Sequence, residues 1–174
     1  MERSHGTDEA EMRAVPGLLK FTPNTNLEVT MRFPLSSLSS YTSVELKNTW
    51  NHLNQVCFDG SLKVPFLAME SPDTLLSRVD DFVADYNIDP KLDVRSGYPA
   101  GLCLWDFPRD RATILISRDI KTANEFLEVV AHEMVHQAIA QQLGFKEMCV
   151  IGHGPVFLSY RSHLARHPGL KLIV

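Results

Sequence analysis

The sequence predicts an α+β domain in which helices pack on a small, mostly antiparallel sheet. Two kinds of segment predict this fold. Some stretches repeat apolar residues every three or four positions, as helices do, and between them lie short apolar runs typical of strands. Hydrophobic residues are 44% and charged residues 22% of the 174 residues, which is ordinary globular usage. We therefore expect one domain of residues 41–174 after an extension of residues 1–40.

The extension is polar and rich in turn-forming residues, with one exception. Residues 27–33 alternate apolar and polar side chains, which is the period of a half-buried strand. The apolar members are Leu27, Val29, Met31 and Phe33. We expect this segment to be extended and to dock on a sheet edge or on a protein partner.

The first helix and the first strand follow the extension. Thr42 and Glu45 have the spacing of a capping box, and Asp59-Gly60 is a stop signal. Between them one apolar face is formed by Leu46, Trp50, Leu53 and Cys57. Residues 62–69 are apolar enough for a strand, which Pro65 restricts to a sheet edge or a bulge.

A second helix and a hairpin come next. Asp73 is expected to cap a helix that keeps apolar residues at helical spacing up to Asp89-Pro90. Residues 101–106 and 112–117 are predicted strands, and residues 107–110 join them as a hairpin.

The clearest helical periodicity lies in the C-terminal third. Thr122 and Glu125 form a second capping-box pattern, and the helix that they open is expected to end at Gly144. Its inward side chains are expected to be Phe126, Val129, Val130 and Met134. A closing helix is predicted from about Pro155 to His167. One side of it carries Phe157, Tyr160 and Leu164.

The third predicted helix contains the motif His132-Glu133-Met134-Val135-His136. Residues four apart share a helix face, so the imidazoles of His132 and His136 can bind one metal ion. Glu133 can accept the proton of the water that attacks a carbonyl group, while zinc supplies Lewis acidity and lowers the pKa of that water. The motif therefore predicts a zinc-dependent hydrolase.

A catalytic zinc site usually has three protein ligands and one open position. Glu147 is one candidate for the third ligand, but it follows closely on the turn at Gly144 and would have to fold back sharply. His153 is favoured, because the glycines on both sides of it let the backbone approach the site closely.

Residues 132–136 together with Gly152-His153-Gly154-Pro155-x-Phe157 resemble the SprT-like metalloprotease family, which includes the Spartan proteases. Two earlier segments agree with the resemblance, which covers about residues 42–167. They are Trp50-x-x-Leu53-Asn54-x-x-x-Phe58-Asp59-Gly60-x-Leu62 and Gly101-x-Cys103 followed by residues 112–117.

The resemblance implies a zincin-like fold with an HExxH helix and a closing C-terminal helix. It implies that His132, His136 and His153 bind Zn2+ and that Glu133 is the catalytic base. Against the family pattern, the helical region of about residues 73–90 looks like an insertion.

We expect a metallopeptidase that hydrolyses peptide bonds in a protein or peptide substrate. One alternative is a non-catalytic or structural SprT-like protein within a larger assembly, a viral one included. The other is a DNA-associated repair protease acting on DNA–protein crosslinks, although no cysteine-rich zinc ribbon or long basic tail follows the last helix. The net charge of -4 gives no general attraction to phosphate backbones. The candidate DNA contact is a basic C-terminal cluster of Arg161, His163, Arg166, His167 and Lys171.

Cysteine usage and hydropathy bear on the compartment. Cys57, Cys103 and Cys149 are far apart among apolar neighbours and are expected to be buried, reduced thiols. There is no apolar run long enough to span a bilayer and no N-terminal secretory signal. We expect an intracellular protein without membrane contact, cytoplasmic in general, nuclear in a eukaryote and virion-associated in a virus.

For three further side chains we expect a structural rather than a functional role. His52 is expected to face solvent rather than the metal. Tyr160 is expected to pack in the core with its hydroxyl at the rim, rather than to stabilise an oxyanion. Trp105 is expected to pack over the motif helix.

Overall fold

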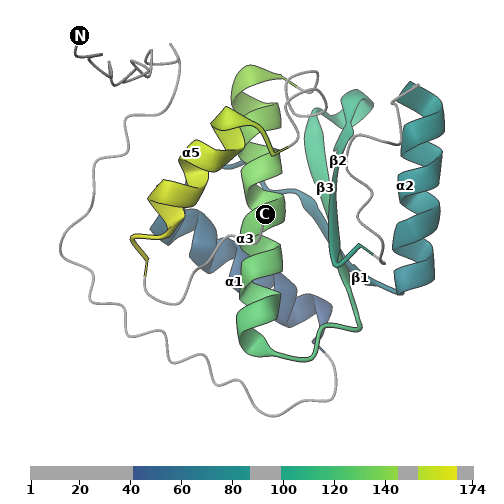
Figure 1. The fold of residues 1–174 in the computed structure, drawn as a ribbon, viewed down its shortest axis with the longest axis horizontal. Coiled ribbons are helices and arrows are strands. Elements are labelled where there is room, and N and C mark those ends of the chain that lie inside the picture. Colours follow the sequence, from purple (N-terminus) through teal and green to yellow (C-terminus); the bar gives the residue numbers. More distant parts are fainter. Residues whose placement is uncertain (1–40, 87–98, 145–152, 168–174) are drawn as a thin grey trace, which may run out of the picture.

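The computed structural model describes residues 41–86, 99–144 and 153–167, which form an α+β fold (Figure 1). The predicted docking segment, residues 27–33, lies outside the described residues. In chain order the elements are α1 (Ser43–Cys57), β1 (Phe66–Glu70), α2 (Pro72–Tyr86), β2 (Gly101–Asp106), the 3-10 turn η2 (Phe107–Arg109), β3 (Arg111–Ser117), α3 (Ala123–Leu143) and α5 (Pro155–Leu164). No helix within the described ranges is long and apolar enough to cross a membrane.

The described sheet has three strands in the order β1-β3-β2. β2 and β3 form the predicted antiparallel hairpin, with Gly101 opposite Ile116. β1 pairs with β3 in parallel, so the expectation of a mostly antiparallel sheet is wrong and the sheet is mixed. A tight turn forces β2 and β3 to run in opposite directions, whereas β1 is joined to the hairpin by a long connection that permits either direction. Pro65 immediately precedes β1, which is an edge strand as predicted.

The first helix begins as the sequence predicts. The Thr42 hydroxyl oxygen accepts a hydrogen bond from the Glu45 backbone N–H, and the Glu45 carboxylate accepts one from the Thr42 N–H at 2.8 Å. The predicted apolar face is buried, and burial of Leu46 and Leu53 stabilises the fold by roughly 1.5–3 kcal/mol each. The helix ends at Cys57, and the chain turns away at Asp59 and Gly60, which take positive φ values of 52° and 68°.

The start of α2 differs from the prediction. Ser71, not Asp73, caps the helix, because the Ser71 hydroxyl oxygen accepts a hydrogen bond from the Thr74 backbone N–H at 3.2 Å. Asp73 lies in the first turn, where a negative charge is also favourable. The helix is described as far as Tyr86, and the rest of the expected segment up to residue 90 lies outside the described residues.

The longest described helix, α3, runs between the sheet and the helices α1 and α5, while α2 covers the opposite face of the sheet (Figure 1). Thr122 caps α3, but the reciprocal half of the predicted capping box is missing: the Glu125 carboxylate accepts a hydrogen bond from the Lys121 N–H instead. The helix ends at Gly144, which has a φ of 97°. All four predicted inward residues of α3 are buried.

The closing helix α5 is shorter than expected and ends at Leu164 rather than His167. Pro155 occupies its first turn, as predicted, and Phe157, Tyr160 and Leu164 are buried. This helix therefore packs one side against α3 and fixes the end of the chain segment that carries His153.

Candidate metal centre

Two histidines of the site lie one turn apart on α3. The helical spacing places His132 and His136 on the same side, and their Nε2 atoms are 3.2 Å apart. Both side chains are half-buried. The helix on which they lie is held on both sides by core packing, so their backbone positions are rigidly set.

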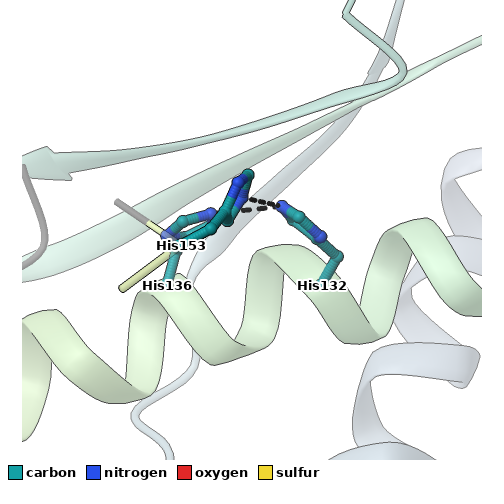
Figure 2. A group of neighbouring side chains, drawn as sticks. All are labelled: His132, His136 and His153. Carbon is teal, nitrogen blue, oxygen red and sulfur yellow. Dashed lines mark hydrogen bonds between the residues drawn. The ribbon is translucent and has the colours of Figure 1, made fainter. Parts of the chain in front are cut away.

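His153 reaches the same point from the segment just before α5. Its Nε2 atom lies 2.9 Å from that of His132, and Figure 2 shows the ring meeting the two rings that rise from α3. Phe157, in the first turn of α5, contacts all three imidazoles, with ring-centroid distances of 4.8, 4.9 and 4.6 Å to His132, His136 and His153. Phe157 is fully buried and forms an apolar floor for the cluster.

The donor set fits a metal ion. One ring nitrogen from each histidine lies within 4.8 Å of the others, so the three could hold a metal ion together. Three imidazole nitrogens are a common ligand set for zinc, copper, iron and nickel. Burial, and to a smaller extent the neighbouring His132 and His153, lower the pKa of His136 to about 3, which keeps the ring in the neutral form that a metal requires.

Glu133, between the two α3 histidines in sequence, is only 5% exposed. Burial raises the pKa of its carboxyl group to about 8. A divalent cation held by the neighbouring histidines would favour the ionised form and oppose that shift. The carboxyl group also lies against the backbone of Gly101 on β2.

A row of polar side chains, which the sequence analysis did not predict, continues from Glu133 along the same face of α3. Gln137 is fully buried; its Oε1 accepts a hydrogen bond from the Trp50 indole N–H at 3.1 Å, and its amide donates to the Lys63 carbonyl oxygen at 2.6 Å. Gln141 accepts a hydrogen bond from the Lys63 N–H at 2.9 Å. The available signal was the four-residue spacing of these polar side chains within an otherwise apolar helix.

Three other residues considered in the sequence analysis are buried or half-buried and lie outside the histidine cluster. The Tyr160 side chain is buried and its hydroxyl donates to the Gln142 side-chain oxygen at 3.0 Å, which agrees with a core role. Trp105 is half-buried and packs against the core, on a strand that contacts α3. His52 is half-buried rather than solvent-facing, and it is not part of the histidine cluster.

Some of the cysteines and some residues of the basic C-terminal cluster lie among the residues that the structure describes. Cys57 and Cys103 are buried and free, as predicted. His163 donates a hydrogen bond to the Cys57 carbonyl oxygen at 3.0 Å, whereas Arg161 and Arg166 are exposed. Outside the described residues lie Glu147, Cys149 and Lys171.

Comparison with models of known families, with curated proteins and with solved structures finds no match. What the site does must therefore be inferred from its own chemistry. Three imidazoles beside a buried carboxyl group can hold a divalent ion and move a proton close to it.

Proposed function

We propose that the protein is a zinc-dependent metallopeptidase of the SprT-like type, which hydrolyses peptide bonds. The observation that carries the proposal is the convergence of one ring nitrogen each from His132, His136 and His153 within 4.8 Å, on a helix that also carries Glu133. Three protein ligands with a remaining open position are characteristic of catalytic rather than structural zinc sites.

Each residue of the site has a defined part in this reaction. His132, His136 and His153 would hold the ion, which supplies Lewis acidity and lowers the pKa of water. Glu133 takes a proton from the attacking water and passes it to the departing amine. The Phe157 ring beneath the imidazoles excludes water from that side and limits the orientations that they can adopt.

The sheet supports a peptide as the substrate. β2 is an edge strand of the described sheet and packs against α3, the helix that carries the motif. The outer side of an edge strand presents backbone N–H and C=O groups, which can align an extended peptide by strand addition. A peptide bound there would run beside the histidine cluster.

The test is the variant Glu133→Gln in the zinc-loaded full chain. We expect zinc content to stay the same and cleavage of an unfolded, fluorescently labelled protein to fall roughly 10²–10⁴-fold, which is what a general base contributes. Glu128→Gln, a half-buried carboxylate on the same helix, is the matched control and should retain cleavage. Equal cleavage by Glu133→Gln and wild type would exclude the proposed base.

A non-catalytic protein with a metal-stabilised fold is the second candidate, and one observation favours it. The three histidines join α3 to the segment that precedes α5, so an ion bound there would stabilise the fold whether or not it took part in a reaction. In that case wild type and Glu133→Gln would both bind zinc and neither would cleave any protein offered.

A further inference from the structure

Gly101 is the first residue of β2, and its backbone lies against the Glu133 side chain. A Cβ atom built on Gly101 would lie 2.8 Å from Glu133 Oε1 and 2.9 Å from Glu133 Cγ. It would also lie 2.8 Å from Cγ1 of Val129, one helical turn earlier. Real Cβ atoms essentially never approach other atoms closer than 3.0 Å, so any side chain at position 101 would force a displacement.

The backbone conformation does not require a glycine at this position. Among the described glycines, positive φ values occur at Gly60 and Gly144 and not at Gly101. Glycine within a strand costs roughly 0.5–1 kcal/mol relative to alanine, and it often marks a close approach of another group. At Gly101 the missing side chain is therefore explained by the space that Glu133 and Val129 occupy.

The groups around Gly101 differ in how far they can yield. β2 is held in register by β3, and the Ser117 N–H donates to the Ala100 carbonyl oxygen at 2.8 Å. Val129 is buried and β-branched, which leaves it one strongly preferred rotamer in a helix. The Glu133 side chain has more rotatable bonds than Val129, so it yields more readily, and its carboxyl group moves with it.

We propose that Gly101 is a positioning residue for Glu133: its missing side chain lets the β2 backbone act as a wall that fixes the carboxyl group beside the histidine cluster. A methyl group at position 101 moves the carboxyl group away from that place, and none of the three atoms nearest to it belongs to a histidine. The catalytic part of this inference rests on the proposed peptidase function. The contact itself does not.

The activity test uses Gly101→Ala in the zinc-loaded full chain. We expect kcat to fall roughly 100-fold, because a displacement of about 1 Å in a catalytic group has that effect. KM and zinc content should stay at wild-type values, since the histidines and the outer edge of β2 are unchanged. Wild-type kcat in Gly101→Ala would overturn the inference.

The matched control is the same exchange at Gly144, where a Cβ atom meets nothing within 4 Å. Gly144→Ala introduces strain, because φ is 97°, and it should lower Tm without changing kcat. The pair separates a general loss of stability from displacement of Glu133. If both variants lose kcat in proportion to their loss of Tm, Gly101 has only a structural role and the inference is wrong.

A second measurement works without any enzymatic activity. Gly101→Ala should lower Tm in the wild-type background and lower it less in the Glu133→Ala background, where the carboxyl group is gone but the Val129 contact remains. Equal Tm shifts in the two backgrounds would overturn the inference whether or not the protein is a peptidase. Unequal shifts in a protein that cleaves nothing would support the contact and count against the proposed function alone.

Discussion

The Nε2 atoms of His132 and His153 lie 2.9 Å apart, although 21 residues separate the two histidines in the chain. The Nε2 atom of His136 is a further 3.2 Å from that of His132. Two neutral imidazoles can share one proton at such a distance, but a single cation can satisfy all three nitrogens at once. The arrangement therefore favours metal binding over a purely hydrogen-bonded cluster.

Removal of the third imidazole, that of His153, should weaken metal binding. We expect His153→Ala to weaken zinc binding by more than about 100-fold, because even partners of metal ligands contribute 10- to 100-fold. Competition with a chromophoric chelator measures the affinity. His52→Ala removes a half-buried histidine outside the cluster and should leave the affinity unchanged. Full-strength binding by His153→Ala would show that another group is the third ligand.

Glu45 and Glu125, the acidic residues of the two capping-box patterns, should contribute differently to stability. The Glu45 carboxylate accepts hydrogen bonds from the Thr42 N–H at 2.8 Å and from the Thr42 hydroxyl at 2.9 Å. Among the described residues, the Glu125 carboxylate accepts one hydrogen bond, from the Lys121 N–H at 3.4 Å. Both acids lie in a first turn, so their interactions with the helix dipole are similar.

Glu45→Ala should therefore destabilise the fold by about 0.5–1 kcal/mol, and Glu125→Ala by less. Urea unfolding of the two variants measures the difference. The reverse order of destabilisation would contradict the assignment of the complete capping box to α1.

Local patterns made much of this fold predictable. The caps at Thr42 and Thr122, the buried faces of α1 and α3 and the β2–β3 hairpin depend on neighbours a few residues apart, which a sequence displays directly. The pairing of His132 with His136 is predictable for the same reason. His153 could be chosen because flanking glycines and Pro155 marked a loop that leads into a helix.

Features that depend on distant segments were not predictable in this way. The parallel pairing of β1 with β3 follows from how the long connection between β1 and the hairpin runs in space. The wall that Gly101 forms against Glu133, and the bond from Trp50 to Gln137, join residues that share no local pattern. The cap at Ser71 was missed because Asp73, also a good capping residue, lies two positions later.

The Cys57 thiol predicts a stability change at high pH. Burial raises the pKa of this group to about 12 from an ordinary value of 9.0. Because folding raises this pKa, the buried thiol contributes to the free energy of unfolding. That contribution is fully present below pH 9.0 and is lost as the pH rises through about 12. The free energy of unfolding should therefore decline more steeply over this range in wild type than in Cys57→Ala.

The same burial protects Cys57 from alkylation. At pH 8 the thiolate fraction is on the order of 10⁻⁴, so iodoacetamide should label Cys57 slowly in the folded protein and quickly in urea. Mass spectrometry of the Cys57 peptide measures the two rates. Rapid labelling in the folded state would mean that the thiol is accessible and that the pH effect has another origin.

The buried amide of Gln137 should be worth more to stability than the amide of Gln141, one turn along the same face of α3. Gln137 accepts the indole N–H of Trp50, a side chain that is 1% exposed, so Gln137→Ala leaves that donor without a partner in the core. An unsatisfied buried donor costs about 1–3 kcal/mol, in addition to the cavity that the truncation leaves. Gln141 forms hydrogen bonds with Lys63 and Ser61, both exposed, and water can replace those bonds.

We expect urea unfolding to show a loss in the free energy of unfolding that is several-fold larger for Gln137→Ala than for Gln141→Ala. In the Trp50→Phe background, where the indole donor is absent, the loss from Gln137→Ala should shrink; an unchanged loss would mean that the hydrogen bond contributes nothing beyond packing.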